Sequence, residues 1–176
     1  MATVSIPLPI PGGLAPDNSG TVNVPATPAM VVSSGTQTTN TPKVSYINLL
    51  FDQSTDEHWM WQFQLPGDYV SGGTLRLVWG SAVTTGDVIW KGGIEIATAS
   101  STDLDAAIFN AADAAAASTV PGTVGHVKET TITLTMTGAG ANLACVVFVG
   151  RDADAAGDTA AGDAALFAAT FTYANA

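Results

Sequence analysis

The stretch whose residue types and spacing come nearest to a chemical site is an acidic segment, residues 152–163. Its aspartates fall at the first, third, seventh and twelfth places of a calcium-loop spacing: Asp152, Asp154, Asp158 and Asp163. Calcium prefers carboxylate oxygens, but the fifth place is Ala156 and the twelfth lacks the usual bidentate glutamate. The segment is therefore an incomplete candidate for a calcium site. The alternative is an inter-strand loop whose aspartates form turns or pair with Arg151.

Groups suited to catalysis are sparse. Only His58 and His126 are available as a histidine base, and a hydrolase needs that base beside a nucleophile. His58 shares a predicted strand face with Met60 and Gln62, which favours a surface or interface histidine. Neither a phosphate-binding loop nor a dinucleotide fingerprint occurs. The single cysteine, Cys145, lies in an apolar run, where a thiol behaves as a small buried hydrophobe. We expect no enzyme, no cofactor and no structural zinc.

Four tryptophans raise a different chemistry, because exposed aromatic rings can stack on sugars. They are Trp59, Trp61, Trp79 and Trp90. They recur at alternate positions of predicted strands, which is more typical of a hydrophobic core than of an open platform. Carbohydrate binding stays an alternative.

The composition excludes several partners. Only 11% of residues are charged, against roughly 25% in an ordinary globular domain, and the formal net charge is −10. The five Lys and Arg residues are scattered, so we expect no nucleic-acid partner and no anionic membrane surface. No basic residue precedes Lys43, so the N-terminus does not resemble a secretory signal. We expect synthesis in the cytoplasm without export.

The elements that position these residues divide at residue 43. Residues 1–42 hold seven of the nine prolines and one charge. Proline fixes φ and lacks an N–H donor, so the segment predicts an extended arm without helix or central strand. Its aliphatic residues are the predicted contacts to a partner protein: Ile6, Leu8, Ile10, Leu14, Val22 and Val24. We expect residues 1–43 to become ordered on that partner and residues 44–176 to fold without them. The alternative is a disordered tail.

From residue 44 onward, apolar and polar residues alternate with the period of a β-strand. Turns rich in Gly, Pro and Asp separate the runs. The predicted strands are 44–51, 57–65, 74–79, 88–97, 128–136, 143–151 and 164–173, with an eighth at 30–33. Residues 100–118 fit either a short alanine-rich helix or a long loop. The pattern predicts an all-β fold, a single jelly-roll β-sandwich of about eight antiparallel strands with an extended proline-rich N-terminal arm.

Short motifs in two halves of this region resemble a recurring module of tailed-bacteriophage virion proteins. The first half contains Phe-Asp-Gln-Ser-Thr-Asp-Glu at 51–57, Leu-Pro-Gly-Asp-Tyr at 65–69 and Gly-Gly-Thr-Leu-Arg-Leu at 72–77. The second half contains Arg-Asp-Ala-Asp at 151–154, Asp-Thr at 158–159 and Gly-Asp-Ala at 162–164, before an aromatic strand that ends at Tyr173. The resemblance covers residues 44–173.

Such modules are single jelly rolls, commonly trimeric, that resemble head decoration proteins, head spikes and fibre domains. The resemblance implies a capsid decoration (cement) protein on the outer surface of the virion head. Its expected partners are the major capsid protein and sister subunits, in a homotrimer. The alternatives are a head-spike or tail-fibre module that contacts the host surface, and a carbohydrate-binding β-sandwich module.

Overall fold

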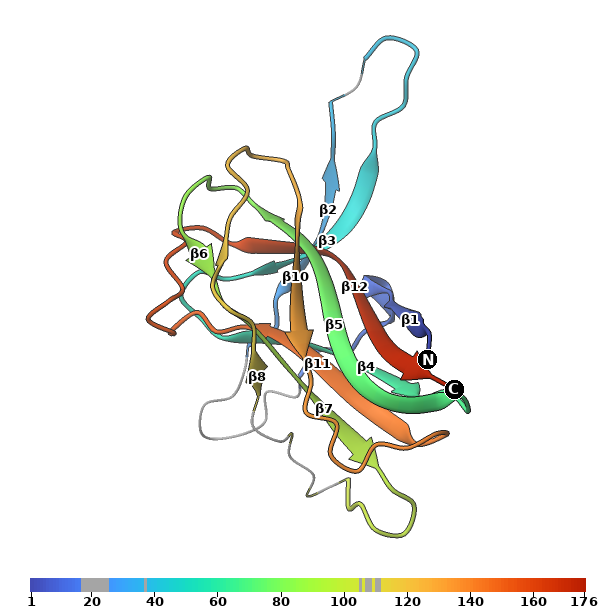
Figure 1. Ribbon diagram of the computed structural model, residues 1–176. Coiled ribbons are helices and arrows are strands. Elements are labelled where there is room, and N and C mark those ends of the chain that lie inside the picture. The colour runs from blue at the N-terminus through green and yellow to red at the C-terminus, as the bar shows by residue number, and fades with distance from the viewer. Residues whose placement is uncertain (17–25, 37, 105, 107–108, 110–111) are drawn as a thin grey trace.

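Two antiparallel β-sheets lie face to face in the computed structural model of the chain (Figure 1). The structure describes residues 1–176 except 17–25, 37, 105, 107–108 and 110–111. The larger sheet has the order β10-β5-β12-β3-β2, and β1 also pairs with β12. The second sheet has the order β4-β11-β7-β8, and β6 pairs with β9. The described elements are β1 (Thr3–Leu8), η1 (Ile10–Gly12), β2 (Ala29–Ser34), β3 (Ser45–Phe51), β4 (Glu57–Gln64), β5 (Tyr69–Ser81), β6 (Asp87–Val88), β7 (Trp90–Ala97), β8 (Asp113–Ala114), β9 (Ser118–Thr119), β10 (Lys128–Thr133), β11 (Ala144–Arg151) and β12 (Ala164–Asn175).

The prediction of an all-β jelly-roll sandwich is confirmed. Alternation along each strand sends one set of side chains between the sheets. In β4, Trp59 and Trp61 are buried, whereas Gln62 and Gln64 on the other face are exposed. The predicted strand at 30–33 is also present, as β2.

Aromatic rings from both sheets meet in the core. Trp79 of β5 and Trp90 of β7 are fully buried, with ring centroids 5.6 Å apart at a steep angle. Phe51 of β3 contacts Trp90 edge to face at 5.1 Å. The Trp79 indole N–H donates to the Thr130 hydroxyl at 2.9 Å, so this buried polar group is satisfied. These contacts join the two sheets.

The two motif groups that carry the phage resemblance lie against each other. The corner between β3 and β4 is closed locally, since the Asp52 amide donates to the Glu57 carboxylate at 2.7 Å. The Asp56 carboxylate accepts a hydrogen bond from the Ala153 amide at 2.8 Å. The corner at 51–57 is thereby tied to the loop that follows β11.

The sequence of residues 100–118 fits either a short helix or a long loop. Their described part contains turns and the two-residue strands β8 and β9, and no helix. The β8 strand pairs with β7. The loop prediction is therefore the better one for the described positions.

The N-terminal arm folds back on its own chain, which corrects the prediction of an arm docked on a partner. Strand β1 pairs antiparallel with β12, from Thr3 opposite Ala174 to Leu8 opposite Ala169. Pro7 is tolerated because β1 is an edge strand. Leu8 and Ile10, two of the predicted partner contacts, are each 4% exposed inside the core. The apolar area of these two side chains is therefore buried within their own chain and is not available to a partner.

The arm also covers both tryptophans of β4. The Pro9 carbonyl accepts a hydrogen bond from the Trp61 indole N–H at 2.9 Å. Gly13 lies so close to Trp59 that a Cβ at this position would stand 1.9 Å from the indole nitrogen. Glycine is required here because of that close approach.

The predicted boundary at residue 43 falls inside a hairpin. Strand β2 lies before it and β3 after it, and the two pair from Ala29 opposite Leu50 to Ser34 opposite Ser45. Removing residues 1–42 would take away β1, η1 and β2. The structure thus gives no support to a sandwich that is complete without the arm.

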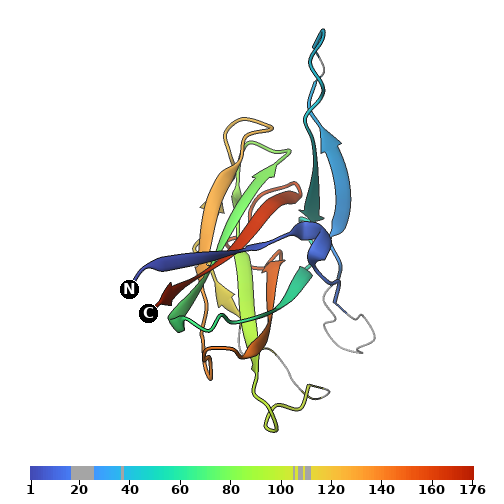
Figure 2. The same ribbon diagram turned by 90° about the vertical axis from the view of Figure 1, so that its right-hand side faces the viewer.

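The two chain ends lie side by side, away from the tip of the β2–β3 hairpin (Figures 1 and 2). The Ala2 amide donates to the Asn175 side-chain oxygen at 3.1 Å, and the Asn175 amide donates to the Ala2 carbonyl at 3.1 Å. Among the described residues, no helix has the length and apolarity needed to cross a membrane.

Leu8→Ala and Ile10→Ala should each lower the free energy of unfolding by about 2–5 kcal/mol, because each deletes a core side chain. Leu14→Ala is the matched control, since Leu14 is 55% exposed and should change stability by less than about 0.5 kcal/mol. Chemical denaturation measures all three. A Leu8→Ala protein as stable as the Leu14→Ala protein would mean that β1 does not pack as described.

Candidate partner-binding surface

The β2–β3 hairpin extends beyond the sandwich (Figures 1 and 2). Its strands continue the larger sheet outward, so the side of the hairpin that would face the core has no second sheet to pack on in the part of the chain that the structure describes. Three large apolar side chains lie on this side: Met30 is 53% exposed, Val32 76% and Ile47 37%. We call them the back face. Val32 lies opposite Ile47 across the ladder, so they form one continuous apolar strip.

The other side of the hairpin, the front face, borders an apolar groove of about 500 Å³. The residues that contribute apolar side chains to it come from β3, β12 and the loop before β10: Val44, Tyr46, Leu50, Val124, Val127 and Phe167. The rings of Tyr46 and Phe167 meet edge to face at 5.4 Å. Four of these side chains are more than 40% exposed, namely Val44, Val124, Val127 and Phe167.

A few polar groups line the same groove. The Asn48 side chain is 5% exposed, and its oxygen accepts a hydrogen bond from the Ser33 hydroxyl at 3.3 Å. The Asn48 amide nitrogen has no hydrogen-bond partner among the described residues. Asp163 and His126 lie at the groove as well. These groups can orient a bound segment, whereas most of the lining can only exclude water.

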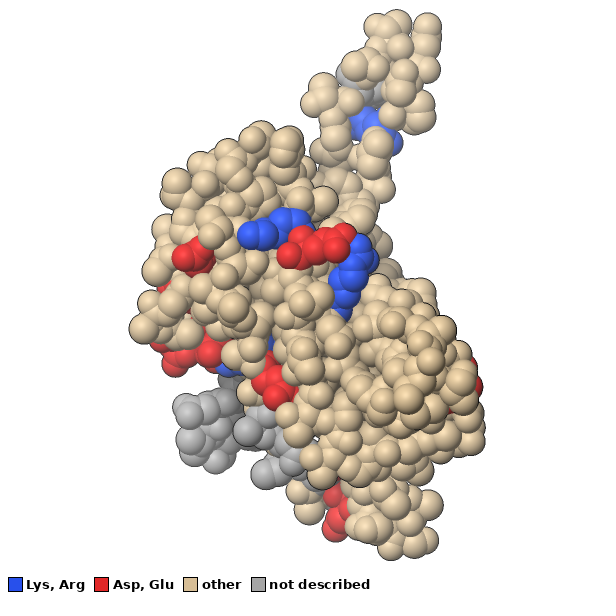
Figure 3. Space-filling model, viewed as in Figure 1, with Lys and Arg blue, Asp and Glu red and all other residues tan. Residues whose placement is uncertain are grey.

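Charge is almost absent from the hairpin. Lys43 is the only charged residue between residues 26 and 51, and the hairpin in Figure 3 is accordingly uncharged except for one basic residue. Natural edge strands usually carry charges or prolines that block further pairing. The outer edge of β2 has neither within Ala29–Ser34. The hairpin therefore has the character of a surface that becomes covered by protein.

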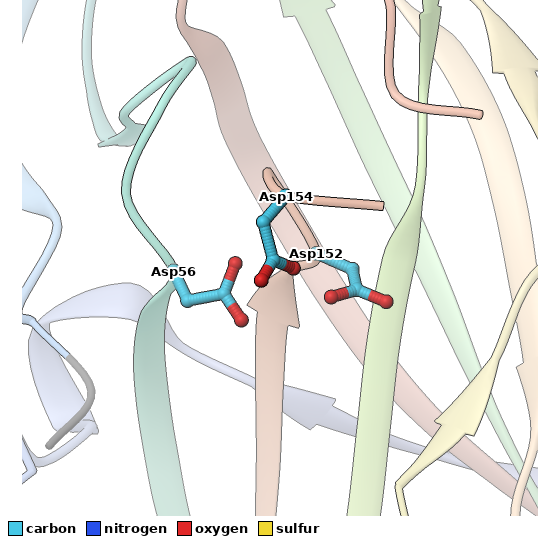
Figure 4. Close-up of side chains that lie close together, drawn as sticks. All are labelled: Asp56, Asp152 and Asp154. Atoms are coloured by element: carbon cyan, nitrogen blue, oxygen red, sulfur yellow. The ribbon is translucent and has the colours of Figure 1, made fainter. Parts of the chain in front are cut away.

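The aspartates of the acidic segment do not converge as the calcium-loop spacing predicted. Asp152 and Asp154 lie with Asp56 of the β3–β4 corner, with carboxylate oxygens within 4.8 Å of one another (Figure 4). Asp158 pairs instead with Arg151, and Asp163 borders the groove. Asp56 was missed because it lies almost 100 residues earlier, and the spacing of one segment carries no signal for it.

A lysine already pairs with two of the three aspartates of this cluster. The Lys91 ammonium contacts the Asp56 carboxylate and lies 3.2 Å from that of Asp152. Burial alone would lower the pKa of Lys91, but its hydrogen bonds to the two carboxylates outweigh burial and raise it. The side chain therefore stays charged, and a calcium ion would have to displace it.

Arg151 is fully buried and pairs with Asp158. The structure therefore agrees with the alternative in which the loop aspartates pair with Arg151. Its guanidinium forms two hydrogen bonds to Asp158, at 2.9 and 2.6 Å, in the planar paired arrangement that favours arginine. It also donates to the Gly162 and Ala160 carbonyls at 2.9 Å and to the Phe51 carbonyl at 3.4 Å. The residues 152–163 are thus an inter-strand loop held around an arginine.

The predicted partner contacts of the arm lie in different environments. Leu8 and Ile10 are in the core, and Ile6 is half-buried against it. Leu14 is exposed and exchanges two backbone hydrogen bonds with Met60, at 2.7 and 2.9 Å. Val22 and Val24 lie outside the described residues. Among the described members of the set, only Leu14 has an exposed side chain with which it could contact another protein.

Two of the three reactive side chains that the sequence offers, His58 and Cys145, are held in inert settings. His58 is half-buried against Phe148 at 5.0 Å, and its Nδ1 atom has no hydrogen-bond partner. Burial, reinforced by the charge of Lys91, lowers the pKa of His58 to about 4. Burial raises the pKa of the Cys145 thiol to about 12. His58 is therefore neutral at pH 7 and packs as part of the sheet, which corrects the first half of the expectation of a surface or interface histidine.

All four tryptophans are buried, at 0–7% exposure, so none offers a face to a sugar. The exposed aromatic rings at the groove are those of Tyr46 and Phe167, which the sequence reading did not single out. Tyr46 lies in β3 and Phe167 in β12. The signal that the sequence offers for them is that both strands carry almost no charge on either face.

Comparison of the chain with models of known protein families and with curated proteins finds no match. Among solved structures, the chain is similar to the carbohydrate-binding module described as CBM35 from Cellvibrio japonicus Abf62. The TM-score is 0.48 and the identity 10%, over 93% of this chain and 98% of that chain. At this level the likeness concerns the arrangement of the strands and does not extend to the residues of a site.

Asp158→Asn should lower the free energy of unfolding by about 3–5 kcal/mol, because it leaves the buried Arg151 without a counter-charge. Asp154→Asn is the matched control, since Asp154 is exposed and lies in the same loop. Thermal and denaturant unfolding would compare the two proteins. Equal losses of stability would contradict a central role for the Arg151–Asp158 pair.

Proposed function

We propose that this chain is a non-enzymatic structural protein of a tailed-phage particle, and that the β2–β3 hairpin and its groove are the surface through which it assembles. The observation that carries the proposal is a hairpin with apolar side chains on both faces and a single charge, beside an apolar groove. The resemblance of the sequence motifs to phage virion proteins supports the assignment to a phage particle. The outer surface of the head is the proposed location. The major capsid protein and sister subunits are the proposed partners there.

Burial of the hairpin would supply the free energy of attachment. Each fully buried Val, Ile or Met side chain contributes about 1.5–3 kcal/mol, and Met30, Val32 and Ile47 are available together. Few charges would have to be desolvated, since Lys43 is the only one on the hairpin. The free edge of β2 adds backbone N–H and C=O groups that can pair with a further strand. A partner surface of protein fits these groups better than a small molecule does.

An antibody against the chain should label the outer surface of heads in purified particles of the virus that encodes it. Immunogold electron microscopy locates the label, and mass spectrometry of the same particles measures copy number. An antibody against the major capsid protein, applied to intact and disrupted particles, is the control. Label confined to tails or to one vertex would favour the spike or fibre role. Absence of the chain from purified particles would rule the proposal out.

A second candidate function is carbohydrate binding at the groove. The observation that favours it is local: the exposed rings of Tyr46 and Phe167 stand beside the free amide nitrogen of Asn48. Aromatic faces stack on the apolar side of a sugar, and an amide can bond to its hydroxyl groups. The aliphatic residues around them fit a sugar less well than a protein segment.

If the groove binds a glycan, Tyr46→Ala should weaken that binding by at least tenfold, through loss of the ring. Val70→Ala, at the start of β5 and 45% exposed, should leave it unchanged. A glycan array followed by calorimetry on any binder would measure both. No binding above background by the unmodified chain removes this candidate and leaves the assembly role as it stands.

A further inference from the structure

The front and back of the hairpin cannot satisfy each other within one chain. They are opposite faces of the same two strands, since Tyr46 and Ile47 are adjacent in β3 and point to opposite sides. The groove opens on the front side, and the exposed strip of Met30, Val32 and Ile47 lies on the back. Each face is therefore open to a second molecule.

We propose that the second molecule is another copy of this chain, with the back face of one hairpin packed into the front groove of the next. This inference names the partner of the surface described above, and in that sense it rests on the proposed assembly role. The contact is head to tail, because each copy offers a different surface to each neighbour. A head-to-tail contact closes into a ring when its rotation permits.

The two surfaces match in size. An apolar cavity of roughly 150 Å³ holds one benzene-sized group, so a groove of about 500 Å³ accommodates about three such side chains. The back face presents three large apolar side chains in one strip: Met30, Val32 and Ile47. Both partners are aliphatic, apart from the Tyr46 and Phe167 rings on the groove side. Their contact would remove both exposed apolar surfaces from water at once.

The charges match as well. Lys43 belongs to the hairpin, just before β3 begins at Ser45, and it has no ion-pair partner among the described residues. Asp163 borders the groove that the neighbouring back face would enter. The hairpin therefore brings a cation to an anionic site. No acidic residue lies between residues 26 and 51, so the hairpin itself brings no negative charge to the contact.

The test uses one substitution on each surface of the full chain. Val32→Asp places a charge on the back face, and Val127→Asp places one in the groove. Both side chains are more than half exposed, so neither change should unfold the protein. Val70→Asp is the matched control, because Val70 is an exposed valine at the opposite end of β5 from the groove residue Gly80. Sedimentation equilibrium gives the masses, and circular dichroism confirms the fold of each variant.

We expect the unmodified chain and Val70→Asp to sediment as the ring, and each of the other variants as single chains of 17.8 kDa. An equimolar mixture of Val32→Asp and Val127→Asp should form a pair and nothing larger. In that mixture one intact back face meets one intact groove, and the other two surfaces are blocked.

Three results would overturn the inference: an unmodified chain that stays monomeric at micromolar concentration, a Val127→Asp protein that assembles fully, or a mixture that shows no pair. Full assembly of Val127→Asp combined with loss in Val32→Asp would point to edge-to-edge pairing of β2 instead. A monomeric chain that still labels phage heads would end the inference and leave the proposed function intact. A ring that is absent from particles would do the reverse.

Discussion

The fold depends on one buried ion pair, that of Arg151 with Asp158. All five N–H groups of the guanidinium have acceptors: two carboxylate oxygens and the carbonyls of Phe51, Ala160 and Gly162. Such complete pairing matters because a buried charge without partners costs several kcal/mol. The pair joins the end of β3, the end of β11 and the loop that leads into β12. Strand β12 then starts at Ala164 and pairs with β1, β3 and β5, so the arginine fixes where the larger sheet begins its central strand.

The candidate surface is a consequence of the same arrangement. The second half of β3 is anchored, since Leu49 and Phe51 are fully buried and the Phe51 carbonyl bonds to Arg151. Its first half runs outward with β2 and leaves the cover of the second sheet. A single strand thus has a rigid part in the core and an exposed part beyond it. A binding element built on a strand of the core is held more precisely than one carried on a loop, which suits an assembly role.

Sequence reasoning predicted most of the sandwich, because alternation of apolar and polar residues is a local signal that burial enforces. The β4 pattern around Trp59 and Trp61 is the clearest case. Sequence reasoning was wrong about where the arm packs. The prolines excluded a helix and a central strand, but β1 is an edge strand, which needs few of its N–H groups, and it pairs within its own chain. Sequence reasoning offered the pairing of Arg151 with a loop aspartate as an alternative, but it failed to bring Asp56 to Asp152 and Asp154, which lie almost 100 residues later. Such long-range pairs leave no mark in the spacing of a segment.

The adjacency of the two chain ends has a practical consequence for construction of variants. Ala2 and Asn175 already share two hydrogen bonds, so a short linker could join the ends and a new start be opened in an exposed turn elsewhere. Circular permutation of this kind preserves every strand pairing while it changes the order in which the strands are synthesised. A peptide or protein fused at either end would project from the side of the molecule remote from the hairpin (Figure 2). The chain is thereby suited to serve as a display scaffold whose cargo stays clear of its own assembly surface.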